Sequence, residues 1–208
     1  MNRWMLLAAA VFVMNFPSMA LAHPGHGPAD HGIADHAMGG LTHGLTHPLT
    51  GIDHLLTLIA VALIAVRIGG RAMWAVPAAF LAMGAIGASA ASLGWSVPMA
   101  EAMIIGSVLV AGLTLASRRT APTFLLSVIC GFGLFHGYAH VIEMAGTVTV
   151  ASYSIGLMAT SLGMIVIAMM SAKSVQRLGS TETFTKACRI VGGSLTVAAI
   201  AMMLVYVG

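Results

Sequence analysis

Residues 122–143 read PTFLLSVICGFGLFHGYAHVIE, a continuously apolar run that carries two histidines and ends on an acid. A helix of about 20 residues crosses the hydrocarbon core of a bilayer, which is about 30 Å thick. Backbone polar groups must pair internally there, so a continuous apolar run predicts a helix, whereas a strand of a membrane barrel would alternate apolar and polar residues. His136, His140 and Glu143 are costly in such a helix, and each therefore needs a functional reason.

The composition of the whole chain agrees with a membrane protein. Of its 208 residues, 59% are hydrophobic and 7% are charged, whereas soluble domains carry about 25% charged residues. This excludes a soluble enzyme, a disordered chain and a disulfide scaffold. The net charge of +3 with His neutral gives no sign of nucleic-acid binding, because the basic residues are scattered among apolar runs. Cys130 and Cys188 form no CxxC pair and suggest no disulfide framework.

Five further apolar runs accompany this one, and together they predict an all-α, polytopic membrane helix bundle. Prolines lie at or near the first turn of four runs, where a missing N–H costs little, and aromatics lie near predicted ends, as they do at membrane interfaces. The six predicted transmembrane helices cover 48–66, 72–93, 98–117, 122–143, 149–171 and 187–207. The prolines are Pro48, Pro77, Pro98 and Pro122, and the aromatics are Trp74, Trp95, Tyr153 and Tyr206.

The start of the chain is typical of a secretory signal peptide over 1–22. Arg3 supplies a positive charge, 5–16 is an apolar core too short to cross a bilayer comfortably, and 20–22 (Ala-Leu-Ala) fits the small-x-small cleavage rule. We expect cleavage before His23. An uncleaved first helix is the alternative.

Residues 23–46 are rich in His and Gly without an apolar period, and predict a periplasmic segment without a fixed fold of its own. Such a segment can hold metal ions weakly and raise their concentration near the membrane domain, 47–208. The alternative is a solvated leader with no binding role. The candidate accessory metal ligands are His23, His26, His31, His36 and His43, accompanied by Asp30 and Asp35.

Basic residues predict the orientation of the bundle. Within 47–208 they occur at the first, third and fifth connections between predicted helices, and an excess of Lys and Arg marks the cytoplasmic side. Both ends of the mature chain then face the periplasm, as a cleaved signal peptide also requires for its N-terminus. We therefore expect a multi-pass membrane protein. The residues are Arg67, Arg71, Arg118, Arg119, Lys173, Arg177, Lys186 and Arg189.

A first polar motif lies in the first predicted helix, where His47 is followed by Asp53 and His54. If one helix includes both histidines, their spacing of seven makes them nearly eclipsed at about 100° per residue. Imidazole and carboxylate together suit a divalent metal ion, the carboxylate as ligand or as an orienting partner. The alternative is an acid at a helix N-terminus beside a hydrogen-bonded histidine.

The second motif is the polar stripe in 122–143. His136, His140 and Glu143 lie at about 0°, 40° and −20° around a helix and share one narrow face. Two histidines at this spacing can bind one metal ion together, although a stripe that only joins helices by hydrogen bonds remains the alternative. Both motifs fall toward the predicted outer end of the bundle, so we expect them to converge on one ion.

Other polar and small residues have weaker interpretations. Gly131, Gly133 and Gly137 predict close helix approach near the second motif. Glu101 faces either the same outer vestibule or the lipid headgroups. The sixteen methionines could suggest Cu(I), but they are mostly single residues in apolar helices, where methionine fills gaps.

The two motifs resemble those of the HupE/UreJ family of bacterial membrane proteins. The first family motif, His-x5-Asp-His, is matched by His47, Asp53 and His54, and the second, Phe-His-Gly-x-Ala/Val-His-Gly-x-Glu, is matched by residues 135–143 except that Val141 stands where the family usually has Gly. The resemblance covers the whole chain. It implies nickel supply for hydrogenase or urease, with relatives assigned to cobalt and hence a link to cobalamin pathways.

We therefore expect secondary uptake of Ni²⁺ or Co²⁺, with no tightly bound cofactor and no catalytic residue. The chain has no GxxxxGK[ST] phosphate loop that would point to ATP. The expected metal ligands are His47, Asp53, His54, His136, His140 and Glu143. The alternatives are an intramembrane metal-dependent hydrolase with Glu143 as general base, and a metal-binding accessory protein without flux.

Overall fold

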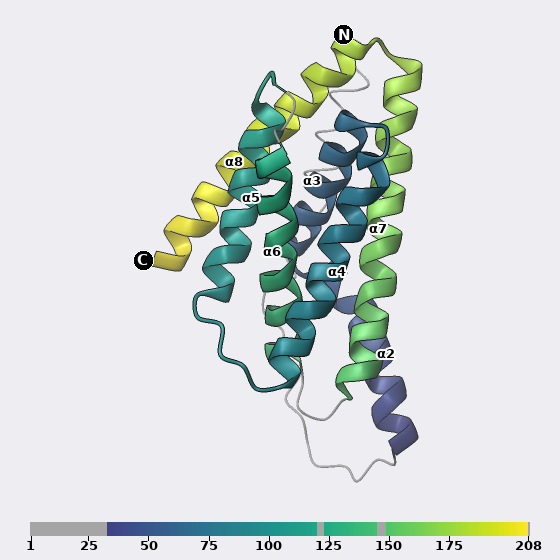
Figure 1. The fold of residues 1–208 in the computed structure, drawn as a ribbon, viewed down its shortest axis with the longest axis vertical. Coiled ribbons are helices and arrows are strands. Elements are labelled where there is room, and N and C mark those ends of the chain that lie inside the picture. Colours follow the sequence, from purple (N-terminus) through teal and green to yellow (C-terminus); the bar gives the residue numbers. More distant parts are fainter. Residues whose placement is uncertain (1–32, 120–122, 145–148, 208) are drawn as a thin grey trace. The chain divides into compact units, whose positions relative to one another are not determined.

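The computed structural model describes residues 33–119, 123–144 and 149–207, and the side chains from 38 onward within these ranges. Helices make up the described elements, which confirms the all-α class (Figure 1). The predicted signal peptide 1–22 lies outside the described residues, as do His23, His26 and His31. The helices are α2 (Ile33–Thr50), α3 (Ile52–Ile68), α4 (Ala72–Ser92), α5 (Ala100–Ala116), α6 (Thr123–Ile142), α7 (Val150–Leu178) and α8 (Thr181–Val207).

Helices α4, α6, α7 and α8 are long and apolar enough to cross a membrane, and α2 with α3 makes a fifth candidate if the bent pair is one span. The structure differs from the prediction of six spans at α5. This helix is apolar but has 17 residues, about 26 Å at 1.5 Å per residue, which is roughly one turn short of the bilayer core. Exposed large apolar side chains on the candidate spans suit a lipid environment, among them Trp74, Phe124, Ile167 and Leu204.

The first predicted span is not one continuous helix. Helix α2 ends at Thr50, Gly51 adopts an extended conformation (φ −87°, ψ 113°), and α3 begins at Ile52, with a bend of 76° between the two helices. Pro48 lies inside α2 near its end, so its placement in a first turn was wrong. Its ring removes the hydrogen bond to the Gly44 carbonyl and weakens the helix just before the break.

Helix α2 also begins well inside the segment predicted to lack a fixed fold. Its buried positions are Gly40, Gly44 and Pro48, one turn apart. A Cβ on Gly44 would collide with the Tyr153 carbonyl of α7, and one on Gly156 would collide with the Leu41 carbonyl of α2. The helix is therefore stabilised by packing its small-residue stripe against α7, as membrane helices commonly do.

Glycine contacts also bring α4 against α6, where the second motif lies. A Cβ on Gly137 would collide with the Gly84 carbonyl, and a Cβ on Gly133 with the Phe80 carbonyl, so both confirm the predicted close approach. Gly131 has open space around its Cβ position, and its expected part in this contact was wrong. The sequence spacing of Gly133 and Gly137 thus identifies the packed face of α6.

Helix α3 lies at the centre of the helices that hold the site. It contacts α4, α5 and α7, and its side chains from Leu58 to Val66 supply much of the apolar core. At its C-terminal end, Arg67 donates hydrogen bonds to four carbonyls at the end of α5 and just beyond, including those of Leu115 and Ser117. The C-terminal ends of α3, α5 and α7 lie at the upper end in Figure 1, opposite the C-terminal ends of α4 and α6.

Candidate metal-ion site

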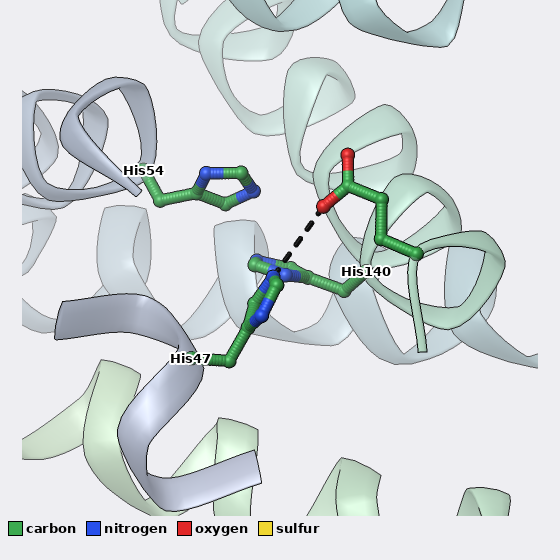
Figure 2. Close-up of side chains that lie close together, drawn as sticks. His47, His54 and His140 are labelled. Atoms are coloured by element: carbon green, nitrogen blue, oxygen red, sulfur yellow. Dashed lines mark ion pairs between the residues drawn. The ribbon is translucent and has the colours of Figure 1, made fainter. Parts of the chain in front are cut away.

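Four of the predicted ligands come together from three helices. His47 lies on α2, His54 in the first turn of α3, and His140 in the last turn of α6, with Glu143 just beyond it. One nitrogen or oxygen atom from each of the four lies within 4.8 Å of the others. Figure 2 shows the three imidazoles approaching one another from separate elements. We call His47, His54, His140 and Glu143 the outer group.

The distances within the outer group suit a shared ion. His47 Nε2 lies 3.4 Å from Glu143 Oε2, the pair marked by the dashed line in Figure 2, and the rings of His54 and His140 are 4.0 Å apart between centroids. Metal–ligand bonds of about 2.1 Å place neighbouring ligand atoms about 3–4 Å apart. Small side-chain rotations are therefore enough to let all four groups bind one ion.

The two histidines of the first motif meet by a different route from the one predicted. They lie on separate helices, so the eclipsed geometry of a continuous helix was wrong, yet the 76° bend at Gly51 brings the rings of His47 and His54 to 5.8 Å. Gly51 also makes room for the His54 ring, since a Cβ there would lie 2.6 Å from His54 Nδ1. The break between α2 and α3 therefore helps to bring His47 and His54 together.

Asp53 is hydrogen-bonded to His54 and lies outside the outer group. Its Oδ1 accepts a hydrogen bond of 2.9 Å from His54 Nδ1. This bond fixes the tautomer of the imidazole and leaves Nε2 with its lone pair available, the usual arrangement of a carboxylate behind a histidine ligand. His54 Nε2 is buried and has no hydrogen-bond partner among the described residues.

His136 lies one helical turn before His140, farther into the bundle. Its ring centroid is 4.4 Å from that of His54 and 5.2 Å from that of His140, but it is not part of the outer group. Both of its ring nitrogens are buried without a hydrogen-bond partner in the described part of the chain, as is Nδ1 of His140. Each buried polar group left unpaired costs about 1–3 kcal/mol. These imidazoles therefore favour a bound group, such as a metal ion, that accepts a nitrogen lone pair.

The site is most accessible at Glu143 and least accessible at the histidines behind it. The Glu143 side chain is 39% exposed and that of His47 18%, whereas that of His54 is 5% exposed. An ion would therefore reach Glu143 and His47 first. The sequence left open whether Glu101 faces the outer vestibule or the lipid headgroups. In the structure Glu101 is exposed, in the first turn of α5, and it lies outside the outer group.

Tyr153 on α7 is a site residue that the sequence did not reveal. It was expected at a membrane interface, but it is fully buried, and its ring lies 5.3 Å from that of His43 and 5.9 Å from that of His47. Its hydroxyl has no hydrogen-bond partner among the described residues. The other three aromatics expected at interfaces, Trp74, Trp95 and Tyr206, are exposed.

Of the candidate accessory ligands, His43 lies beside the outer group, since its ring is close to those of His47 and Tyr153. The side chain of His36 lies outside the described part.

Fold and site together define a multi-pass helical membrane protein with a histidine- and carboxylate-lined group that could hold a metal ion. The family model described as HupE / UreJ protein matches residues 11–202. "Protein HupE" from Rhizobium leguminosarum bv. viciae is 31% identical over 198 residues, which cover 95% of this chain and 96% of that protein. The chain therefore belongs to the HupE/UreJ family. No solved structure matches it.

Val141, the departure from the family motif, packs in a small apolar cluster with Ala88 and Ala91 of α4 and with Tyr138. The short alanine side chains on α4 leave room for the additional bulk. The Tyr138 hydroxyl accepts a hydrogen bond from the Val97 backbone N–H, 3.1 Å away, which ties α6 to the segment before α5. The substitution is therefore accommodated by apolar packing and removes no candidate ligand.

Proposed function

We propose that this protein takes up a divalent transition-metal ion, nickel or cobalt, across the bacterial inner membrane by secondary transport. The observation that carries the proposal is the outer group, in which three imidazoles and one carboxylate from α2, α3 and α6 lie within reach of one ion. Membership of the HupE/UreJ family, generally nickel and cobalt uptake permeases, supports it. We assign no catalytic residue and no resident cofactor.

The chemistry of the outer group suits reversible binding. Imidazole nitrogen and carboxylate oxygen are good ligands for Ni²⁺ and Co²⁺, whereas Mg²⁺ and Ca²⁺ prefer sites made of oxygen alone. The one carboxylate of the group, on Glu143, leaves a bound divalent ion with net positive charge. Transport requires binding strong enough to admit the ion and weak enough to release it, and a mostly neutral ligand set meets both requirements.

We propose that the ion arrives from the periplasm at Glu143 and His47 and leaves toward the end of the bundle that carries Arg67. This direction rests on the basic connections, which mark the cytoplasmic side, and on the greater exposure of Glu143. A membrane potential negative inside contributes about 2.3 kcal/mol per charge per 100 mV, and about twice that for a divalent ion. That is sufficient to drive uptake without nucleotide hydrolysis.

Residues 23–46 would collect ions in the periplasm, through His23, His26, His31, His36 and His43. In this arrangement His43 would pass the ion to His47, its neighbour in α2 with a ring 5.7 Å away. Inside the cell the metal would supply hydrogenase, urease or cobalamin pathways, the partners that the family suggests.

The test is uptake by purified protein in liposomes, measured with a panel of Ni²⁺, Co²⁺, Zn²⁺, Mn²⁺ and Mg²⁺ under an inside-negative potential. We expect influx of Ni²⁺ or Co²⁺ that is saturable and abolished in His140→Ala. Binding without influx would indicate an accessory protein instead. Turnover of a lipid or peptide without influx would indicate a metal-dependent hydrolase.

A further inference from the structure

A small cavity adjoins the outer group on its buried side. His136 and His140 of α6, Met158 and Ser161 of α7, and Leu58 of α3 are among the residues that line it. His140 thus belongs both to the outer group and to the wall of this cavity.

The polar atoms of this wall come from two helices. His136 and Ser161 are 4% and 6% exposed, and both ring nitrogens of His136 have no hydrogen-bond partner in the described part of the chain. The thioether of Met158 completes the set. Side chains that carry nitrogen, oxygen and sulfur donors therefore line one cavity whose remaining walls are apolar, with Leu58 and Phe80 among them.

Helix register places the cavity one layer deeper than the outer group. Leu58 follows His54 by one turn on α3, and His136 precedes His140 by one turn on α6. On α7, Ser161 follows the fully buried Tyr153 by two turns. One turn of helix is about 5.4 Å, a distance that matches the 5.2 Å between the rings of His136 and His140.

The cavity is about 10 Å³ in volume, roughly the space that one water molecule needs. A hydrated divalent ion cannot enter such a space, but an ion that has exchanged its waters for protein ligands can. Gly84, Gly133 and Gly137 also line the cavity. A Cβ on Gly84 would lie 3.3 Å from Met158 Cε. The glycine therefore leaves room for the end of the Met158 side chain.

We propose that this cavity is a second, inner metal-binding site, in which His136, Ser161 and Met158 hold a dehydrated transition-metal ion passed on by His140. The inference rests on the proposed transport function and adds a ligand set from α7. A thioether is a poor ligand for Mg²⁺ or Mn²⁺ and a better one for later first-row ions. The inner site would therefore discriminate against the hard ions that a carboxylate at the entrance admits.

The experiment compares Met158→Leu and Ser161→Ala with matched controls on the same helix, Met164→Leu and Ser171→Ala. Nickel uptake into liposomes gives the maximum rate and the half-maximal concentration. Equilibrium dialysis gives the number of ions bound per chain, and X-ray absorption at the nickel edge detects a sulfur neighbour.

We expect the wild type to bind two ions per chain at saturation, one with a sulfur neighbour. Mutation of the groups that support metal ligands typically costs about 10–100-fold in affinity or activity, and we expect losses of at least this size here. Met158→Leu should lose the sulfur signal and the second ion, and both cavity variants should lower the maximum rate about tenfold while the half-maximal concentration, set by the outer group, changes little. The controls should match the wild type.

The outcomes separate this inference from the function on which it rests. If the wild type transports nickel and both cavity variants transport at the wild-type rate, the inner site is wrong and the proposed function stands. A wild type that binds one ion without a sulfur neighbour also overturns the inner site. If the wild type transports no metal from the panel, the proposed function fails. Each cavity variant should retain the first bound ion, and loss of both ions would contradict an inner site separate from the outer group.

Discussion

His47 Nε2 lies 3.4 Å from Glu143 Oε2, so the end of α2 and the end of α6 face each other across the opening of the outer group. Glu143→Gln keeps the size of the side chain and removes its charge. We expect metal affinity and uptake at limiting Ni²⁺ to fall about 10–100-fold, the usual cost of losing one contributing group. Isothermal titration and liposome uptake measure the two effects.

The matched control is Glu182→Gln. Glu182 is an exposed acid in the first turn of α8, paired with Lys186, and it lies outside the outer group. Its replacement should leave affinity and uptake unchanged, because an exposed pair of this kind contributes little. Equal losses in both variants would mean that the Glu143 effect reflects overall charge and not ligation.

Asp53 should act through His54 and not as a ligand. In Asp53→Asn the amide oxygen can still accept the Nδ1–H bond now made at 2.9 Å, but without a negative charge, so the imidazole becomes a weaker donor to metal. We expect an intermediate loss of affinity in Asp53→Asn and a complete loss of uptake in Asp53→Ala. Identical behaviour of Asn and Ala variants would contradict the orienting role.

Part of this site could be predicted from sequence because it depends on local spacing. The i, i+4, i+7 pattern of His136, His140 and Glu143 fixes one face of a helix whatever surrounds it, and the His-x5-Asp-His motif marks its partner. The glycine spacing also identified the face of α6 that contacts α4, through Gly133 and Gly137.

Features that depend on tertiary contacts could not be predicted. Helix α2 packs against α7 at Gly44 and Gly156, a tertiary contact that the sequence of 23–46 did not reveal, because this segment was predicted to lack a fixed fold. Tyr153 joins the site only because α2 approaches α7 through glycines. Its sequence neighbourhood is that of any aromatic near the end of a membrane helix.

Gly137 should be essential for the geometry of α6. In Gly137→Ala the new Cβ would collide with the Gly84 carbonyl, so α4 and α6 must separate and carry His136 and His140 with them. Overpacking of this kind costs about 1–3 kcal/mol. We expect a lower Tm in detergent together with weaker metal binding.

Gly131→Ala on the same helix provides the comparison, because nothing lies within 4 Å of its Cβ position. Alanine favours helix over glycine by up to about 1 kcal/mol, so this variant should be as stable as the wild type or slightly more so. A fall in Tm equal to that of Gly137→Ala would show that close packing is not the cause.

Uptake should depend on external pH through competition between protons and metal for the imidazoles. A protonated imidazole has no lone pair for a metal, and the reference pKa of histidine is about 6.5. At limiting Ni²⁺, uptake should fall as the external pH is lowered, and raising the Ni²⁺ concentration should restore it. A fall at low pH that added Ni²⁺ does not reverse would contradict competition between protons and metal at the imidazoles.

The contribution of residues 23–32 can be tested apart from that of the described part of α2, Ile33–Thr50. Deleting 23–42 would remove most of α2, including Leu41, which packs on Gly156 of α7, and would disturb the position of His47. Deleting 23–32 keeps the described helix Ile33–Thr50 while removing His23, His26 and His31. The shorter deletion should raise the half-maximal metal concentration and spare the maximum rate, because a capture segment changes local concentration only. If the maximum rate collapses instead, residues 23–32 belong to the transport path itself and do not act only by capturing ions.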